Sequence, residues 1–366
     1  MAGAGVLGLA LGLELARRGV ETVVLDRGAP GPAAGALSAA GTGLVDPQSR
    51  PGPAPESVRD LSLLSRHLFG DWIEALEEET GLPCEYDVRG GLAVALADSE
   101  EVILDRALDW QRARALAFDV LPGEEVRSRE PALSEAVRAA FSFPEDGQIH
   151  PSRLARALLL AARRAGTLVV GQTPVTGVRV GNGFVSGVET PAGSVRAEAV
   201  VDAAGAGAGL LGGAPPLPLT PVRIPQLLLD AADDPDRLTR FVHGTGCALA
   251  PRRDGTLLVA GESGRGGFDP DLSAREAAGL LSSAARIVPA AGGYPLLAAR
   301  AFFAGASPDG GPIAGETATA GLFVAAGEGR DTVLLAPALA LLLADLLTGQ
   351  TPPLSPAPFS PARFGL

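Results

Sequence analysis

The sequence predicts a composite α/β (α+β) fold, in which a Rossmann-like domain with a truncated first strand is interrupted by an inserted antiparallel-sheet domain. Three observations lead to this prediction. The chain opens with a G-x-G-x-x-G pattern formed by Gly3, Gly5 and Gly8. Buried-strand patterns that run into glycines recur in the middle and near the end of the chain, and segments of alternating strand pattern lie between them. Because only Met1 and Ala2 precede Gly3, the first strand is nearly absent.

The composition argues against a nucleic-acid-binding protein and excludes lysine-based chemistry. The 366 residues are 46% hydrophobic and 20% charged, as in a folded globular protein of one large or two interleaved domains. The net charge of −12 argues against a nucleic-acid partner, because phosphates would be repelled. All 30 basic residues are arginine, which excludes any lysine-based covalent chemistry.

Cysteine and hydropathy patterns predict the compartment. Cys84 and Cys247 form no CxxC pair, and the three histidines are scattered, so we expect no metal site and a reducing cytoplasm. The apolar run Thr332–Leu347 contains Pro337 and Asp345 and is shorter than the ~20 residues that a membrane span needs. It therefore predicts a buried helix, and no membrane span is expected.

Periodicity assigns the elements in order. Helices end where glycine follows, as at Gly19 and Gly81, and short β-branched runs predict buried strands. The expected helices are Leu7–Arg18, Glu56–Thr80, Ser99–Phe118, Ser152–Ala165, Ser273–Ile287 and a last one ending near Leu347. The expected strands lie within Glu21–Leu25, Glu85–Leu96, Leu168–Val170, Val175–Val180, Phe184–Thr190, Ser194–Ala197, Glu198–Gly205, Val222–Leu258 and Leu322–Ala326. Residues 29–55 are expected to be a long loop. We assign residues 1–84, 146–220 and 308–366 to a discontinuous nucleotide-binding domain, and residues 85–145 and 221–307 to a substrate domain.

The opening pattern predicts a dinucleotide site. Its glycines allow a tight turn and close approach of a pyrophosphate to a helix N-terminus. Asp26 follows Gly8 by 18 residues at the end of the next strand, where its carboxylate can accept a hydrogen bond from a ribose hydroxyl. The alternative is a chance match in a chain with 48 glycines; the helix, the strand and Asp26 together favour the site.

Two later segments point to the same cofactor. Val200–Gly209 is a strand ending in small residues, where backbone can lie against a ring or a ribose. Gly327–Pro337 (GEGRDTVLLAP) ends a strand and opens a helix whose N–H groups can face a partial negative charge. Tight helix–strand packing is the alternative for each.

Taken in order over essentially the whole chain, these segments resemble the FAD-dependent D-amino-acid oxidase superfamily, and most of all its glycine oxidase branch. The resemblance rests on GAGVLGLALGLELARRG…VVLDR, GALSAAGTGL, GQIHPSRLARAL, TPVR, SPDGGPIAG and GEGRDTVLLAP. It implies FAD, bound noncovalently because neither cysteine lies in a flavin motif. The residues that it implies for FAD binding are Gly3, Gly5, Val6, Leu7, Gly8, Asp26, Arg27, Ala39, Ala40, Gly41, Val175, Ala204, Gly205, Gly327, Gly329, Arg330, Asp331 and Thr332.

The resemblance also implies oxidation of an amino acid or amine by hydride transfer to flavin N5, with dioxygen or another acceptor reoxidising the flavin and a link to thiamine synthesis. The substrate side departs from the family pattern. The carboxylate-holding arginine aligns with Ala304, a substrate-facing tyrosine falls near Cys247 or Ala248, and His-Tyr becomes Glu328-Gly329. Arg330 is kept.

Two arginines are therefore the candidate catalytic residues. Arg330 is favoured for a flavin or substrate role over a salt bridge at the helix start. Arg300 lies four residues before Ala304 on the same strand face, although an ordinary surface charge is the alternative for it.

Three matters stay open. The protein could be a flavin-binding homologue or complex subunit without amino-acid oxidase activity, or, less in keeping with the later motifs, an NAD-dependent dehydrogenase. The electron acceptor and any homo-oligomer are undetermined. Because two residues cannot fill a buried central strand, we expect the natural polypeptide to begin several residues upstream with a Val/Ile/Leu-rich run.

Overall fold

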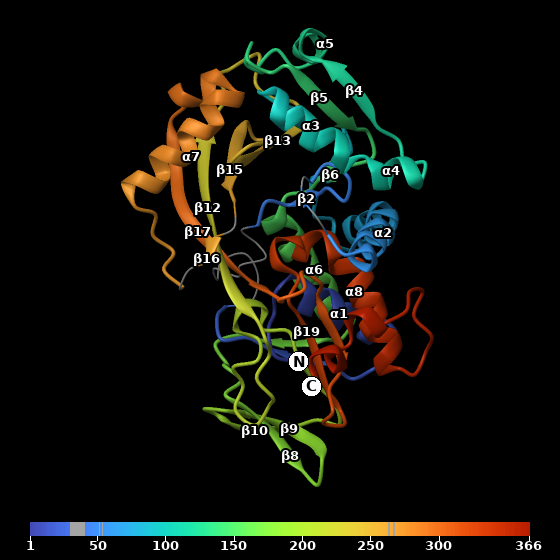
Figure 1. Cartoon of the computed structure of the whole chain (residues 1–366). Helices are drawn as coiled ribbons and strands as arrows, with labels where there is room; N and C mark the ends of the chain where they lie inside the picture. Colours follow the sequence, from blue (N-terminus) through green and yellow to red (C-terminus); the bar gives the residue numbers. More distant parts are fainter. Residues whose placement is uncertain (30–40, 51, 53, 263, 266–267) are drawn as a thin grey trace.

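The computed structural model describes residues 1–29, 41–50, 52, 54–262, 264–265 and 268–366. Two sheets dominate it: a short parallel sheet in the lower half of Figure 1 and a large mixed sheet in the upper half. The predicted composite fold is confirmed.

The parallel sheet is built around the opening residues of the chain. Ala2 forms parallel bridges to Leu25 on one side and Asp202 on the other, so the opening residues lie between β1 and β11. The Ala2 amide donates to the Val201 carbonyl (2.9 Å) and the Gly3 amide to the Leu25 carbonyl (2.8 Å). The strands are β7 (Leu168–Val170), β1 (Val23–Leu25), β11 (Val200–Asp202), β19 (Leu322–Ala326) and the antiparallel β18 (Ile313–Glu316).

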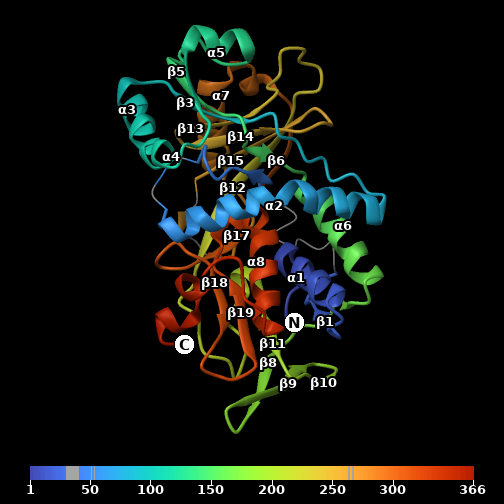
Figure 2. The same ribbon diagram turned by 90° about the vertical axis from the view of Figure 1, so that its right-hand side faces the viewer.

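Helices cover one face of this sheet and an antiparallel meander covers the other. Figure 2 shows α2 crossing the middle of the molecule above α1, α6 and α8. These helices share one apolar core with Val24, Val201 and Phe323 of the sheet. Their bounds are α1 (Val6–Arg17), α2 (Glu56–Thr80), α6 (Pro151–Arg164) and α8 (Thr332–Leu347). The meander comprises β8 (Gly177–Gly181), β9 (Phe184–Thr190) and β10 (Gly193–Arg196).

The large sheet combines strands from two separate stretches of chain. Its strands are β3 (Gly91–Ala95), β4 (Asp119–Pro122), β5 (Ala139–Phe143), β12 (Thr220–Asp230), β13 (Phe241–Gly244), β14 (Cys247–Pro251), β15 (Thr256–Gly261), β16 (Gly264–Arg265) and β17 (Leu296–Ala306). All pairings are antiparallel except β13 with β3, which joins the two stretches in parallel register. The helices beside it are α3 (Asp98–Ala107), α4 (Asp109–Ala113), α5 (Gly123–Arg129) and α7 (Ala274–Ile287).

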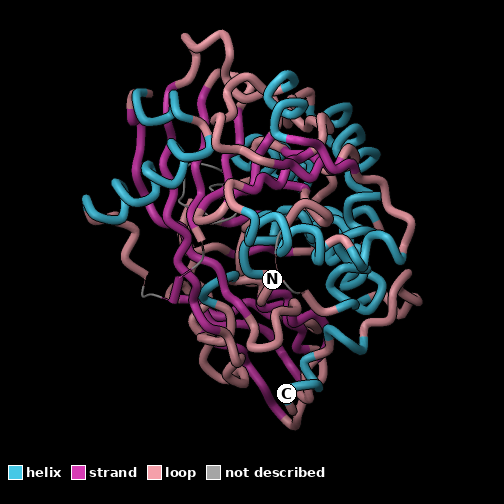
Figure 3. The backbone as a smooth tube through the Cα atoms, turned by 45° about the horizontal axis from the view of Figure 1, so that its top comes forward, coloured by secondary structure: helices cyan, strands magenta, loops and turns pink. Residues whose placement is uncertain are grey.

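Two long strands connect the halves of the molecule. β12 and β17 have 11 residues each and run from the large sheet toward the parallel sheet (Figures 1 and 3). Ala306, at the end of β17, forms a bridge with Glu328, which directly follows β19. The ends of these strands therefore cover the region between the two sheets.

Two sequence expectations were wrong in detail. The single helix expected over Ser99–Phe118 is divided at Leu108 into α3 and α4 and ends at Ala113, short of Ala115, whose φ of +52° a right-handed helix cannot contain. The expected long loop contains a short strand, β2 (Leu44–Val45), which pairs with β6 (Gly147–Gln148). None of the helices in the described ranges is long and apolar enough to cross a membrane.

Candidate active site

The opening glycines form a turn that no other residue can occupy. Gly3 has φ +111°, and a Cβ there would lie 2.3 Å from the Ala203 carbonyl oxygen. A Cβ on Gly8 would lie 2.1 Å from the carbonyl oxygen of Gly3. The first turn of α1 is therefore packed directly against the ends of two strands, and no side chain caps the helix at Gly5. This leaves backbone N–H groups at the amino end of α1 for an anionic ligand.

Asp26 links the end of β1 to this turn. Its carboxylate accepts hydrogen bonds from the amides of Ala4 (2.7 Å) and Gly28 (2.8 Å). Each carboxylate oxygen keeps a further lone pair, so a ribose hydroxyl can still donate to it. The Thr173 amide donates to the Asp26 carbonyl (2.7 Å), which brings the segment with the partly buried Val175 beside it. The neighbouring Arg27 side chain is exposed.

A cavity opens where the parallel strands end. It is lined by small residues from the opening turn, the segment after β11, the loop before β2 and the segment after β19, with side chains of β12 and β17 above them. The lining residues are Gly5, Leu7, Gly8, Gly41, Thr42, Ala203, Gly205, Ala206, Ile224, Gln226, Phe302, Phe303, Ala304, Gly305, Ala325, Glu328, Gly329, Arg330, Thr332 and Val333. This is the edge of a parallel sheet at which α/β proteins bind nucleotides.

The structure brings most of the expected cofactor residues to this cavity. Val6 and Gly327 are buried in the turns that shape it, Ala204 lies between two lining residues, and Asp331 directly precedes α8 without capping it by a side-chain hydrogen bond. Ala39 and Ala40 lie outside the described residues. Neither Cys84 nor Cys247 lines the cavity; burial raises the pKa of both thiols to about 12.

The two candidate arginines have different surroundings. Arg330 lines the cavity, and it makes no hydrogen bond or ion pair with any residue whose position the structure describes. Burial and the nearby charge of Arg50 lower its pKa. Arg300 is exposed on β17 opposite Gln226 and lines a neighbouring hollow, whereas Ala304 on the same strand lines the cavity itself.

A charged cluster beside Arg330 was not predicted. Arg50 forms an ion pair with Asp331, and the Nε2 atom of His243 lies 2.8 Å from Oδ2 of Asp46. Burial alone would raise the pKa of Asp46, but the hydrogen bond with His243 and the charge of Arg50 lower it. His243, one of the three histidines that are scattered in the sequence, is buried on β13. The only sequence signal for Asp46 and Arg50 was that charges occur in a Gly/Pro/Ala-rich loop.

Glu328 adds a buried carboxyl group to the cavity. It is 8% exposed, and burial, reinforced by Asp331, raises its pKa to about 7. No cation forms an ion pair with it among the residues described. A carboxyl group with this pKa can exchange a proton near neutral pH.

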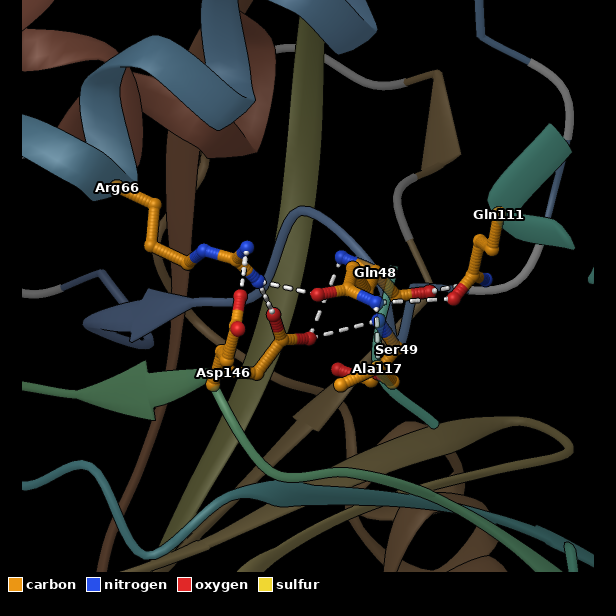
Figure 4. A network of polar contacts seen from close by, with 7 residues as sticks. Gln48, Ser49, Arg66, Gln111, Ala117 and Asp146 are labelled. Carbon is orange, nitrogen blue, oxygen red and sulfur yellow. Dashed lines mark hydrogen bonds and ion pairs between the residues drawn. The ribbon is translucent and has the colours of Figure 1, made fainter. Parts of the chain in front are cut away.

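A polar network holds the loop that carries Asp46 and Arg50 (Figure 4). Asp146, which is fully buried, accepts from the amides of Gln48 (3.3 Å) and Ser49 (2.7 Å) and pairs with Arg66 (3.1 Å). The Gln48 side chain donates to Gln111 Oε1, and the Gln111 side chain donates back to the Gln48 carbonyl (3.2 Å). The loop is therefore fixed between α2, α4 and β6, with Arg50 directed to Asp331.

The cavity fits FAD on structural grounds, because a Cβ at Gly3 or Gly8 would fill its turn and its helix end carries no side-chain cap. Within the described ranges, no group of three or more His, Cys, Asp or Glu residues is arranged to hold a metal ion.

Comparisons with known proteins agree with this site. The family profile described as "DAO: FAD dependent oxidoreductase" matches residues 2–346. Glycine oxidase of Geobacillus kaustophilus is 34% identical over 366 residues, which is 99% of this chain and 95% of that protein. The crystal structure of glycine oxidase from the same organism superposes with a TM-score of 0.90 at 32% identity, covering 98% of this chain and 96% of the other.

A further relative is longer than this chain. The bifunctional protein ThiO/ThiG of Trichormus variabilis is 33% identical over 355 residues, or 95% of this chain, and this chain spans about half of its length. The profile match over nearly the whole chain, together with a relative of similar length above 30% identity, establishes the family. The chain thus belongs to the DAO family of FAD-dependent oxidoreductases.

Proposed function

We propose that this FAD-dependent oxidoreductase oxidises a small amino acid or amine at the carbon that bears the nitrogen, with Arg330 as the group that binds the substrate anion. The observation that carries the proposal is the half-buried guanidinium of Arg330, which has no hydrogen-bond or ion-pair partner among the described residues, in a cavity that Ala304 lines from β17. Such an arginine can offer charge-assisted hydrogen bonds to a carboxylate.

The position of this arginine predicts the substrate class. Arg330 follows β19, whereas the arginine of the related family would stand on β17 at position 304. A carboxylate held from a different wall requires a different pose. We therefore infer poor activity on glycine and better activity on substrates whose carboxylate is farther from the amine or is absent.

Glu328 has a role in proton transfer under this proposal. When bound, FAD accepts a hydride from the substrate carbon that bears the nitrogen, and this requires the neutral amine. The Glu328 carboxylate, ionised above its pKa of about 7, can take the proton from the substrate ammonium at Oε. Water then converts the imine product to a 2-oxo acid or aldehyde and ammonia.

The names of relatives support a biological setting. Glycine oxidase and ThiO/ThiG are among them, so we propose a link to thiamine synthesis, in the cytoplasm, with dioxygen or another acceptor reoxidising the flavin. The alternative of a flavin-binding protein without amino-acid oxidase activity is not favoured.

Anaerobic flavin bleaching tests the proposal. Glycine, sarcosine, D-alanine, β-alanine and ethylamine are each mixed with the protein, and the loss of flavin absorbance is followed. We expect β-alanine or ethylamine to bleach the flavin faster than glycine, and Ala304→Arg to raise kcat/KM for glycine. Efficient oxidation of glycine by the unmodified protein would contradict the assigned pose, and no bleaching by any amine would contradict the function.

A further inference from the structure

A second hollow lies between the large sheet and the start of α6, outside the cavity described above. It is lined in part by Gln148 of β6, His150 at the start of α6, Arg252 and Arg253 of the β14–β15 turn, and Arg237 before β13. It shares no lining residue with the flavin cavity. The proposed function uses none of these side chains.

Two residues that line this hollow each carry a buried polar atom without a hydrogen-bond partner among the described residues. Gln148 is 8% exposed, and its amide nitrogen donates to the Pro251 carbonyl (2.9 Å), but its Oε1 atom makes no hydrogen bond. The Nδ1 atom of His150 is likewise buried and unsatisfied within the described part of the chain. Because an unsatisfied buried polar group costs free energy, each such atom in a folded protein calls for a partner. Both atoms can accept a hydrogen bond, His150 in the tautomer protonated at Nε2.

The hollow also has an excess of positive charge. Arg252 donates to the carbonyls of Ile149 (3.0 Å) and Thr42, Arg253 to that of Tyr86 (3.2 Å), and Arg237 to that of Asp234 (3.3 Å). No carboxylate of a described residue lies within ion-pair distance of these three arginines. Burial lowers the pKa of Arg252 to about 10, so its charge persists at neutral pH.

The two carboxylates that line the hollow are already paired. Asp87 forms an ion pair with Arg89 (3.0 Å) and Glu85 one with Arg153 (3.1 Å). The charges of Asp254 and Glu85 also act on Arg252 at longer range. In a chain of net charge −12, three arginines around one hollow, none with an ion pair to a described residue, still indicate a site for an anion.

We propose that this hollow binds hydrogen phosphate or the phosphate group of a small metabolite. Three arginines suit a dianion better than a single carboxylate, since each can offer charge-assisted hydrogen bonds. The hydroxyl of the phosphate donates to Gln148 Oε1 or His150 Nδ1, which sulfate cannot do at neutral pH. The site is connected to the flavin cavity, because Arg252 binds the carbonyl of Thr42 and Thr42 lines that cavity.

Isothermal titration of the FAD-loaded protein at pH 7 and constant ionic strength tests this site; FAD already occupies the other phosphate-binding turn. We expect saturable one-to-one binding of inorganic phosphate and at least about tenfold weaker binding of sulfate. Methyl phosphate at pH 6, where it keeps a hydroxyl, shows whether a phosphate ester is preferred to the free ion.

Two variants and one control sharpen the test. Arg253→Gln, at an exposed position, should weaken phosphate about tenfold, and Gln148→Leu should remove the preference for phosphate over sulfate. The control Arg179→Gln lies on the meander, where Arg179 pairs with Glu189, and should bind phosphate like the unmodified protein. Equal binding of phosphate and sulfate, or equal phosphate affinity in Arg253→Gln and Arg179→Gln, would overturn the proposal. This result would not bear on amine oxidation, which the bleaching experiment measures separately.

Discussion

The two walls of the active-site cavity are built from different materials. The wall formed by the opening turn and the segment after β11 is made of backbone and small residues, and Gly3 and Gly8 are required there because an added Cβ would lie 2.3 and 2.1 Å from carbonyl oxygens. A second, charged wall is formed by the segment after β19, which carries Glu328 and Arg330, and Arg50 is paired with Asp331 beside it. A backbone-built wall tolerates little change, whereas a side-chain-built wall can change its specificity by single substitutions. The resemblance to the family fits this contrast, because it implies a kept FAD-side pattern and a changed substrate side at Ala304.

The largest expected effect is on the backbone-built wall. Gly3→Ala places a Cβ against the Ala203 carbonyl at a φ of +111°, and we expect a loss of roughly 3–5 kcal/mol in stability together with loss of bound FAD. Gly207→Ala is the matched control, because nothing lies within 4 Å of its added Cβ and its φ is ordinary. Flavin content and thermal unfolding measure both. Full FAD retention in Gly3→Ala would show that the two walls do not differ in tolerance.

Glu328, on the charged wall, predicts that the free energy of unfolding depends on pH. Its pKa is raised from 4.5 to about 7, so the folded protein binds the proton more tightly than the unfolded chain. The stability contribution is therefore complete below about pH 4.5 and is lost as the pH rises through 7, a change of roughly 3 kcal/mol. Glu328→Gln should remove this slope in denaturant unfolding of the FAD-loaded protein measured from pH 4.5 to 8. The buried Asp146, also with a raised pKa of about 7, adds a slope of the same sign to both proteins, so the difference between them is the test. Identical slopes would show that Glu328 does not titrate in this range.

Substitutions of Arg330 and Arg300 test whether only the arginine that lines the cavity binds the substrate. Arg330→Gln should lower kcat/KM for a carboxylate-bearing substrate by roughly 10- to 150-fold, through loss of a charged hydrogen bond, without loss of FAD. Arg300→Gln should change it little, because Arg300 is exposed and does not line the cavity. Steady-state kinetics on the best carboxylate-bearing substrate of the bleaching panel measures both. A larger effect of Arg300→Gln than of Arg330→Gln would show that the anion-binding arginine is on β17.

The smallest expected effect concerns Asp26, a charged side chain that shapes the backbone-built wall. Asp26 accepts from Ala4 and Gly28, and Asp26→Asn keeps the shape but loses the charge. We expect FAD affinity to fall by about 1 kcal/mol in Asp26→Asn and by roughly 1.5–3 kcal/mol in Asp26→Ala. Flavin fluorescence on dilution measures the dissociation constants. An unchanged FAD affinity in Asp26→Ala would show that Asp26 does not bind the cofactor.

Local sequence determined most of the secondary structure and the backbone-built wall. The helix Glu56–Thr80, the strand Leu322–Ala326 and the end of the last helix at Leu347 agree with their predicted bounds, because periodicity and terminating glycines act over a few residues. Part of the glycine turn was also predictable, since the contact of Gly8 with the Gly3 carbonyl joins residues five positions apart, whereas the contact of Gly3 with the Ala203 carbonyl depends on the tertiary structure. The break at Ala115 was not, because alanine carries no signal for positive φ.

Tertiary structure alone decided the charged wall. Asp46 meets His243 across 197 positions of sequence, and Arg50 meets Asp331 across 281. No spacing rule relates residues so far apart, and their charge states follow from burial, which only the packed fold creates. The same holds for the second hollow, where Gln148, His150 and Arg252 come together from different segments of the chain. A glycine's role can be read from its neighbours in the chain, but the role of a charge depends on what folding places beside it.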